Sequence, residues 1–362
     1  MKKNNKIAAL LLASTLATSM LAGCSSANSK NETSKSDKII KIGFVQKTLE
    51  NEFQKALADG LVKAGEAKGF EVTVLDAKNS IENEQRNLET FVSQKYDLIF
   101  INVVDTNAAT EGINAAVEAG IPVIGIDSHV DEAANVVTGI SAPDLGNGRV
   151  VGLYATTQYA KDKLISAAVI SGNKGNPGGL ARRMGEFAGI LEGRIGCTEK
   201  EALALATTFE QELTDKGKAS NKEANFEVIA QGWGSWTVTG GLPAMEDILV
   251  ANPNINCLLG ENDSMLIGAK QAIDDSKKTD QIQIFAAADA MKGALELIKE
   301  GSSYKATGLN NPKLVAAKGI DVAAKILIDN ADVKSFGKVV NTDPACVTKE
   351  NVDEYYDPNA IF

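Results

Sequence analysis

Polar and aromatic side chains follow almost every apolar, strand-like run in this sequence. The residues that could do chemistry are Lys47, Asn51, Phe53, Asn102, Asp127, Arg182, Trp236, Asn262, Asp289 and Asn310. Amide, carboxylate and guanidinium groups can pair with neighbouring hydroxyls, and an aromatic ring can cover an apolar C–H face. This combination favours the binding of a polyhydroxyl ligand.

Two other interpretations fit parts of the same set. Asn51 could cap a helix while Phe53 is a core residue, although capping alone explains poorly why so many strand ends carry such groups. Asp127 and Asp289 could form a carboxylate pair for glycoside hydrolysis. A carboxylate also accepts two sugar hydroxyls, however, and no serine or cysteine has a placed histidine. We therefore expect a binding protein without catalytic residues or a cofactor, not an enzyme.

Composition excludes several classes of function. The chain has 362 residues, of which 44% are hydrophobic and 23% charged, which is typical of a globular protein long enough for two domains. A net charge of −10 without a long basic run argues against a nucleic-acid partner. The single histidine, His129, cannot support a histidine-based metal cluster, and the four cysteines lack the paired spacing of a zinc site.

The first 38 residues are predicted to lie outside the fold. Residues 1–23 have a lysine-containing start and an apolar run too short for a membrane span, as in a signal peptide. The following LAGC (21–24) resembles a bacterial lipobox, which implies cleavage before Cys24 and lipid attachment to its sulfur; the alternative is an ordinary secretory signal. Residues 24–38 then form a flexible tether. We expect an extracytoplasmic, lipid-anchored protein.

From residue 39 onward, strand-like and helix-like runs alternate, which predicts an α/β fold with parallel sheets and right-handed crossovers. Two series of similar size indicate two lobes. The expected strands are 39–46, 71–75, 98–102, 122–126, 136–140, 165–171, 226–230, 256–260, 281–286, 304–309 and 336–340. The expected helices are 50–68, 81–94, 107–119, 145–160, 180–190, 240–250, 263–275, 290–300 and 312–328.

One stretch, 194–224, interrupts this alternation. It is charged and rich in alanine, and we interpret it as an extra helical excursion on the surface, which is either a tolerated insertion or a partner surface. Three cysteines remain besides Cys24. Cys257 lies in an apolar run and is expected to be buried, while a bridge between Cys197 and Cys346 stays open.

Several segments in this order resemble one known family, the ribose/galactose-binding type of ABC-importer sugar-binding lipoproteins and periplasmic proteins. The resemblance covers most of 39–350, and GENDSMLIGA (260–269) is its most specific part. The other segments are KTLENEF (47–53), INVVDTNA (101–108), AGIPVIGIDS (119–128), ARRMGEF (181–187), AAADA (286–290) and ATGLNNP (306–312).

The resemblance implies two Rossmann-like lobes joined by a three-segment hinge, the type I periplasmic binding protein fold. The N-terminal lobe would be 39–143 plus 311–338, and the C-terminal lobe 144–310 plus 339–362, with crossings near Pro143, Asn310 and Gly337-Lys338. The lobes would close on a monosaccharide-like ligand, and a monomer would then dock on ABC permease subunits. The resemblance assigns ligand contacts to Asn51, Phe53, Asp127, Arg182, Trp236, Asn262, Asp289 and Asn310.

Departures from the ribose type leave the ligand open. Where the ribose type has a second aromatic residue, this chain has Gln54. It has Ser128 where the ribose type has an arginine, and Lys47 where the ribose type has a small polar residue. A hexose, another pentose, a charged or modified sugar, a nucleoside or an autoinducer are all possible ligands. A receptor that presents its ligand to a sensor or chemoreceptor would have the same site. A repressor of the lactose class would need an amino-terminal helix-turn-helix, which 1–38 does not contain.

Overall fold

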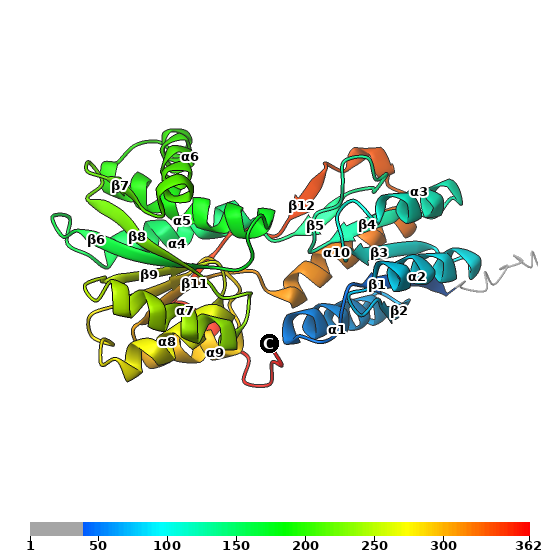
Figure 1. The fold of residues 1–362 in the computed structure, drawn as a ribbon. Coiled ribbons are helices and arrows are strands. Elements are labelled where there is room, and N and C mark those ends of the chain that lie inside the picture. The colour runs from blue at the N-terminus through cyan, green and yellow to red at the C-terminus, as the bar shows by residue number, and fades with distance from the viewer. Residues whose placement is uncertain (1–38) are drawn as a thin grey trace, which may run out of the picture. The chain divides into compact units, whose positions relative to one another are not determined.

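The computed structural model describes residues 39–362. The predicted signal peptide, the tether and the lipid attachment at Cys24 lie outside these described residues. Within 39–362 the strands form two separate sheets, and helices cover both faces of each (Figure 1). We call the part built on each sheet a lobe.

The first sheet has the strand order β12-β5-β4-β3-β1-β2, and all its strands are parallel. Its strands are β1 (Ile40–Gln46), β2 (Phe70–Asp76), β3 (Leu98–Asn102), β4 (Val123–Ile126), β5 (Gly139–Ser141) and β12 (Val339–Asn341). Its helices are α1 (Glu52–Ala67), α2 (Ile81–Ser93), α3 (Thr110–Glu118) and α10 (Pro312–Leu327). A 3-10 turn, η1 (Val333–Ser335), precedes β12.

Strand β1 shows why this sheet is covered on both faces. Ile42 and Phe44 are fully buried in a cluster with α1 and α10, whereas Val45 is buried on the opposite face with α2 and α3. Successive side chains of a strand point to opposite faces, so a run that is apolar at both positions needs helices on each side. Because helices cover both faces of the sheet, a ligand can contact only the ends of such strands.

The second sheet has the strand order β13-β11-β10-β9-β6-β8-β7. Its inner strands are parallel, and the short edge strands β7 and β13 pair antiparallel. The strands are β6 (Ile165–Ser171), β7 (Ala219–Asn221), β8 (Phe226–Trp233), β9 (Cys257–Gly260), β10 (Gln283–Ala286), β11 (Tyr304–Gly308) and β13 (Cys346–Thr348). The helices are α4 (Asp144–Thr157), α5 (Pro177–Ile195), α6 (Glu199–Lys216), α7 (Val238–Ala251), α8 (Asp263–Asp275), α9 (Lys292–Glu300) and the 3-10 turn η2 (Val352–Glu354).

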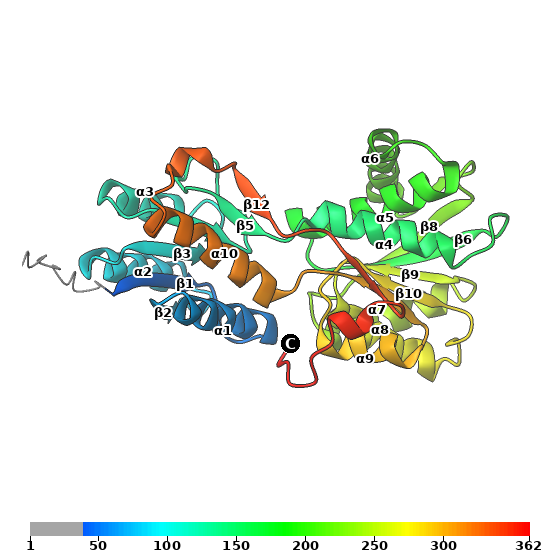
Figure 2. The same cartoon turned by 180° about the vertical axis from the view of Figure 1, so that it is seen from behind.

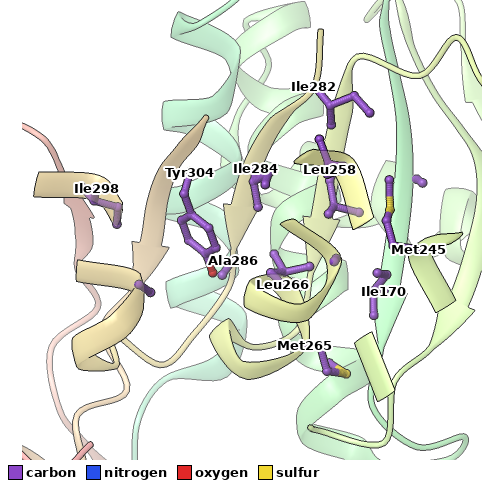
Figure 3. Packing of buried hydrophobic residues seen from close by; sticks show 14 of the residues in the cluster. Ile170, Met245, Leu258, Met265, Leu266, Ile282, Ile284, Ala286, Ile298 and Tyr304 are labelled. Carbon is purple, nitrogen blue, oxygen red and sulfur yellow. The ribbon is translucent and has the colours of Figure 1, made fainter. Parts of the chain in front are cut away.

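The core of the second lobe lies on both faces of this sheet. On one face Ile170, Leu258 and Ile284 pack against Met245 of α7 and Leu266 of α8 (Figure 3). The opposite face is covered by α4, α5 and α6. This double cover matches the near-continuous apolar runs from which the strands were predicted.

The structure confirms the α/β pattern and most element positions, with differences at the edges. Strand β12 pairs with β5 in the first sheet, so Val339–Asn341 belong to the first lobe and the third crossing follows Asn341 instead of lying at Gly337-Lys338 (Figure 2). The edge strands β7 and β13 were not expected; each has only three residues and pairs antiparallel at the edge of the second sheet.

The stretch 194–224 folds into α6 and β7, and it is more than a surface excursion. A capping box between Thr198 and Glu201 starts α6, and Gly217 ends it in a left-handed conformation. Its inner face is buried against the second sheet. Cys197, Cys257 and Cys346 are all free, so the bridge between Cys197 and Cys346 is absent from the structure.

Candidate functional site

The first lobe gathers polar groups around Asp127, which directly follows β4. Three donors meet its Oδ2 atom: Gln54 Nε2 at 3.2 Å, Asn102 Nδ2 at 3.1 Å and Lys47 Nζ at 3.5 Å. Lys47 also donates to the Ser128 hydroxyl at 3.0 Å. The Oδ1 atom of Asp127 has no hydrogen-bond partner within 39–362, so one carboxylate oxygen is available to a ligand.

Asn102 sits at the centre of this cluster, at the end of β3. Its Nδ2 group, which carries two hydrogens, also lies within hydrogen-bond distance of Gln54 Oε1 at 2.7 Å and of Gln46 Oε1 at 2.9 Å, and the residue is fully buried. Its Oδ1 atom is buried without a partner among the described residues. Buried polar atoms are nearly always paired, so Asn102 Oδ1 is an exception within this cluster.

The second lobe gathers its polar groups around Arg182, in the first turns of α5. Arg182 Nε donates to Asp144 Oδ1 at 2.8 Å, and Nη1 donates to the Glu261 carbonyl at 3.1 Å and to Asp289 Oδ1 at 3.3 Å. Burial opposes the charge of Arg182, but Asp144 and Asp289 outweigh it and raise the pKa. The guanidinium group is therefore fixed in its charged form, with Nη2 left over as a donor.

Glycines determine how closely α5 can approach α4. A Cβ atom on Gly148 of α4 would lie 2.1 Å from the Arg182 carbonyl oxygen, and one on Gly185 of α5 would lie 2.3 Å from the Leu145 carbonyl oxygen. The two backbones pack directly against each other, which brings Asp144 within reach of Arg182. The glycines therefore allow the close helix packing that places Asp144 beside Arg182.

Trp236 supplies an aromatic face next to this arginine. The Arg182 Cζ atom lies 5.8 Å from the indole centroid, in the range of a cation–π contact. A Cβ atom on Gly172 would lie 2.0 Å from the Trp236 ring, so the ring packs directly on the backbone at the end of β6. Trp236 is half-buried, which leaves part of the ring for a ligand.

Asp289 follows β10 and is held from several sides. Its Oδ1 atom also accepts from Asn310 Nδ2 at 3.1 Å, and its backbone N–H donates to Asp263 Oδ2 at 3.1 Å. Burial raises the pKa of Asp289 to about 6, despite the opposing effect of Arg182. Burial, and then the Asp289 charge, raise the pKa of Asp263 to about 7. Asp289 Oδ2 has no hydrogen-bond partner within 39–362.

Backbone conformation marks the same places. Asp127, Trp236 and Ala290 have φ angles of 65°, 63° and 63°, in the left-handed region that non-glycine residues rarely occupy. Each such residue costs of the order of 1–3 kcal/mol and persists where its surroundings enforce it, most often at functional sites. They are three of ten such non-glycine residues within 39–362, and these three follow strands at the two clusters.

The structure brings together Lys47, Asn102 and Asp127 in the first lobe, and Arg182, Trp236, Asp289 and Asn310 in the second. Asn51 and Asn262 serve as helix N-caps: their Oδ1 atoms accept from the backbone N–H of Gln54 at 2.9 Å and of Met265 at 3.1 Å. The ring of Phe53 packs partly on the α1–α10 cluster and lies edge-on to Phe362. The side-chain oxygen of Asn51 therefore caps the helix, as the capping interpretation predicts, whereas its Nδ2 group takes no part in the cap.

Four residues of these clusters were not among the predicted site residues: Gln54, Asp144, Glu261 and Asp263. Glu261 and Asp263 had a signal, because they flank Asn262 after an apolar run. Gln54 lies inside the predicted helix 50–68, where a polar residue is normally solvent-facing, and Asp144 lies directly before the predicted helix 145–160.

Two other features, a metal site and a membrane span, are absent from residues 39–362. The described part of the chain holds no group of three or more histidine, cysteine, aspartate or glutamate side chains that could ligate a metal ion. No helix in 39–362 is both long and apolar enough to cross a membrane.

Comparison with known proteins identifies the family. A family model described as a periplasmic binding protein domain matches residues 42–331. This chain belongs to that family. Ribose import binding proteins from Salmonella typhimurium and Bacillus subtilis are each 26% identical to it, over 79% and 82% of this chain and 84% and 85% of theirs.

Solved structures of solute-binding proteins share the fold. An ABC-transporter solute-binding protein from Actinobacillus succinogenes with bound D-allose has a TM-score of 0.71 at 24% identity, covering 87% of this chain and 100% of that chain. One from Bacillus halodurans with bound myo-inositol has a TM-score of 0.67 at 22% identity, covering 87% and 96%. The predicted two-lobe α/β fold is confirmed.

Proposed function

We propose that this protein is the extracytoplasmic solute-binding protein of an ABC importer and that it captures a monosaccharide-like ligand between its two lobes. The main support is that each lobe ends in a fixed cluster of donors and acceptors in which one carboxylate oxygen is unpaired, Oδ1 of Asp127 and Oδ2 of Asp289. Adjacent hydroxyls of a sugar ring are donors and acceptors of matching kind. Relatives named for ribose import share this family.

The proposed roles follow from the contacts. Asp127 and Asp289 accept ligand hydroxyls, and Arg182 and Asn102 complete the polar contacts. Trp236 and Phe53 cover apolar C–H faces of the ring. Lys47, Asn51, Asn262 and Asn310 are proposed at the margin of the site or as supports of these groups. No step of bond making is required, so catalytic residues are not part of the proposal.

The same proposal includes the hinge and the membrane partner. Crossings near Pro143, at Asn310 and after Asn341 would let the lobes close on the ligand, and the closed form would be recognised by the permease subunits. A ligand shifts such an equilibrium only as far as it prefers the closed state. We further propose a monomer anchored to the membrane by lipid on Cys24.

A thermal-shift screen of the purified protein tests this function. The panel holds pentoses, hexoses, cyclitols, disaccharides and nucleosides. A ligand present at about 100 times its dissociation constant stabilises the protein by about 2.7 kcal/mol, which is several degrees in Tm for a protein of this size. We expect a shift with one monosaccharide or cyclitol. A shift with a nucleoside alone would overturn the proposed ligand class, and no shift with any compound of the panel would overturn the function.

A further inference from the structure

A row of three buried charged side chains joins α6 to the ends of the strands in the second lobe. Arg183 of α5 donates through Nε and Nη2 to the carboxylate of Glu210 on α6, at 3.0 Å and 2.5 Å. Through Nη1 it donates to Glu261 Oε1 at 2.7 Å. Glu210, Arg183 and Glu261 are 8%, 9% and 0% exposed. Arg183 thus pairs with two carboxylates, one on α6 and one at the end of β9.

Glu261 connects Arg183 to the proposed ligand site. Its Oε2 atom accepts from the Gly172 backbone N–H at 2.8 Å, and its carbonyl oxygen accepts from Arg182. Gly172 is the residue on which the Trp236 ring packs, and the ring also lies against Gly179. The position of the Glu261 carboxylate therefore bears on the two proposed ligand residues Arg182 and Trp236.

The remaining contacts of α6 do not require this charge. Ala202, Ala206, Phe209 and Leu213 already bury an apolar stripe of the helix against the second lobe. Buried ion pairs are often no more stabilising than apolar residues of similar volume, because both charges lose their hydration. Their better supported use is to fix one arrangement of the parts they join. At Glu210 the joined parts are α6 and the end of β9.

We propose that Glu210 is a positioning residue for the ligand site and that α6 sets ligand affinity through Glu210, Arg183 and Glu261. The inference rests on the proposed function for its ligand and deepens it: the segment 194–224 becomes part of the binding apparatus. Glu210 touches no ligand in this account. It acts by holding Arg183 and, through it, the Glu261 carboxylate under Gly172.

Glu210→Gln is the test variant, because it removes the charge and one acceptor oxygen while keeping the volume. Glu212→Gln is its matched control on the same helix, since Glu212 pairs with Lys216 at the surface. By calorimetry with the monosaccharide selected by thermal shift, we expect Glu210→Gln to bind about five- to tenfold more weakly. Glu212→Gln should bind like the wild type, and Glu210→Asp should recover part of the loss.

A second variant distinguishes an effect of Glu210 on affinity from a general loss of stability of α6. Leu213→Ala weakens the packing of α6 without touching the ions, so we expect a lower Tm with unchanged affinity. If Leu213→Ala weakens binding as much as Glu210→Gln, α6 acts only through general stability and the proposal fails. It also fails if Glu210→Gln binds with wild-type affinity.

A readout without ligand keeps this test independent of the proposed function. Hydrogen exchange followed by mass spectrometry over 170–174 reports the bond from the Gly172 N–H to Glu261. We expect faster exchange in Glu210→Gln than in Glu212→Gln, together with a changed fluorescence of the two tryptophans. Equal exchange in both variants would overturn the positioning role. Absence of binding by the wild type to every compound of the thermal-shift panel would instead overturn the function.

Discussion

The two halves of the proposed site use different chemistry. In the first lobe, neutral amides from Gln54 and Asn102 surround a single carboxylate, and Lys47 reaches it from a partly exposed position. In the second lobe, two buried arginines are shared among carboxylates that come from four different elements or strand ends: Asp144, Glu210, Glu261 and Asp289.

This difference has energetic consequences. A hydrogen bond to a charged group contributes roughly 1.5–3 kcal/mol, and an amide can turn to suit a new partner. Removing one member of a buried ion network costs about 3–5 kcal/mol, because the other charges remain buried and unpaired. We therefore expect the second lobe to hold a fixed half of the site, and the first lobe to be the half that adapts to the ligand.

The largest effect is expected where the buried ions are broken. Arg182→Ala leaves Asp144 and Asp289 without their cation, so the unfolding free energy should fall by about 3 kcal/mol. Ligand affinity should fall about a hundredfold, since the same group donates to the ligand. Urea unfolding and calorimetry measure the two effects.

Arg86→Ala is the matched control for this variant. Arg86 forms an exposed pair with Glu82 at the surface of α2, and its loss should change the unfolding free energy by less than about 0.5 kcal/mol. An affinity of Arg182→Ala equal to that of the wild type would remove Arg182 from the site.

In the first lobe, Asp127→Ala should separate binding from stability. We expect affinity to fall more than tenfold because ligand hydroxyls lose their acceptor, while the unfolding free energy falls by about 1.5 kcal/mol, because the amides can turn to other partners. The same two measurements apply. A stability loss as large as that of Arg182→Ala would contradict the contrast between the two half-sites.

The pH dependence of binding should come from the second lobe. Burial raises the pKa of Asp289 to about 6, so its carboxylate is ionised above that pH and accepts hydroxyls. Affinity should fall by up to tenfold per pH unit below pH 6, as the group becomes protonated. Calorimetry between pH 5 and 8 measures this dependence, and Asp289→Asn should flatten it. A wild-type profile that is flat over this range would show that Asp289 does not meet the ligand as a carboxylate.

The same raised pKa gives an effect of opposite sign on the stability of the ligand-free protein. Because the folded state holds the Asp289 proton more tightly than the unfolded state, this contribution is complete below about pH 4 and is lost as the pH rises through 6. Asp289→Asn should therefore lose less stability than the wild type between pH 4 and 7.

The smallest effect is expected at the edge of the first half-site. Lys47 and Asp127 have side chains that are 26% and 17% exposed, and their atoms are 3.5 Å apart. Lys47→Met should change the unfolding free energy by about 0.5 kcal/mol or less, and a neutral sugar should bind within about threefold of the wild type. A loss above tenfold would instead indicate a ligand that carries a negative charge.

The order of elements could be predicted because the strands are apolar on both faces and the helices are amphipathic. The strand 98–102 and the helix 263–275 have the predicted bounds. The third crossing was misplaced, because Val339–Asn341 form the edge strand of the first sheet and are partly exposed, so they lack a buried pattern.

The groups at the strand ends could also be predicted, since parallel strands place their carboxyl ends at one edge of a sheet. Their partners could not. Arg182 and Asp289 are 107 residues apart, and the choice of Asp144 for the Arg182 Nε depends on the close glycine contact of α4 with α5. Likewise, nothing local to Glu210 indicates that a charge on an amphipathic helix is buried.

A crystal structure of the protein with the monosaccharide selected by thermal shift tests the central claim most directly. The account predicts one sugar with hydroxyl oxygens within hydrogen-bond distance of both Asp127 Oδ1 and Asp289 Oδ2, and a C–H face on Trp236. A sugar bound to only one lobe, or bound away from both carboxylates, would contradict it.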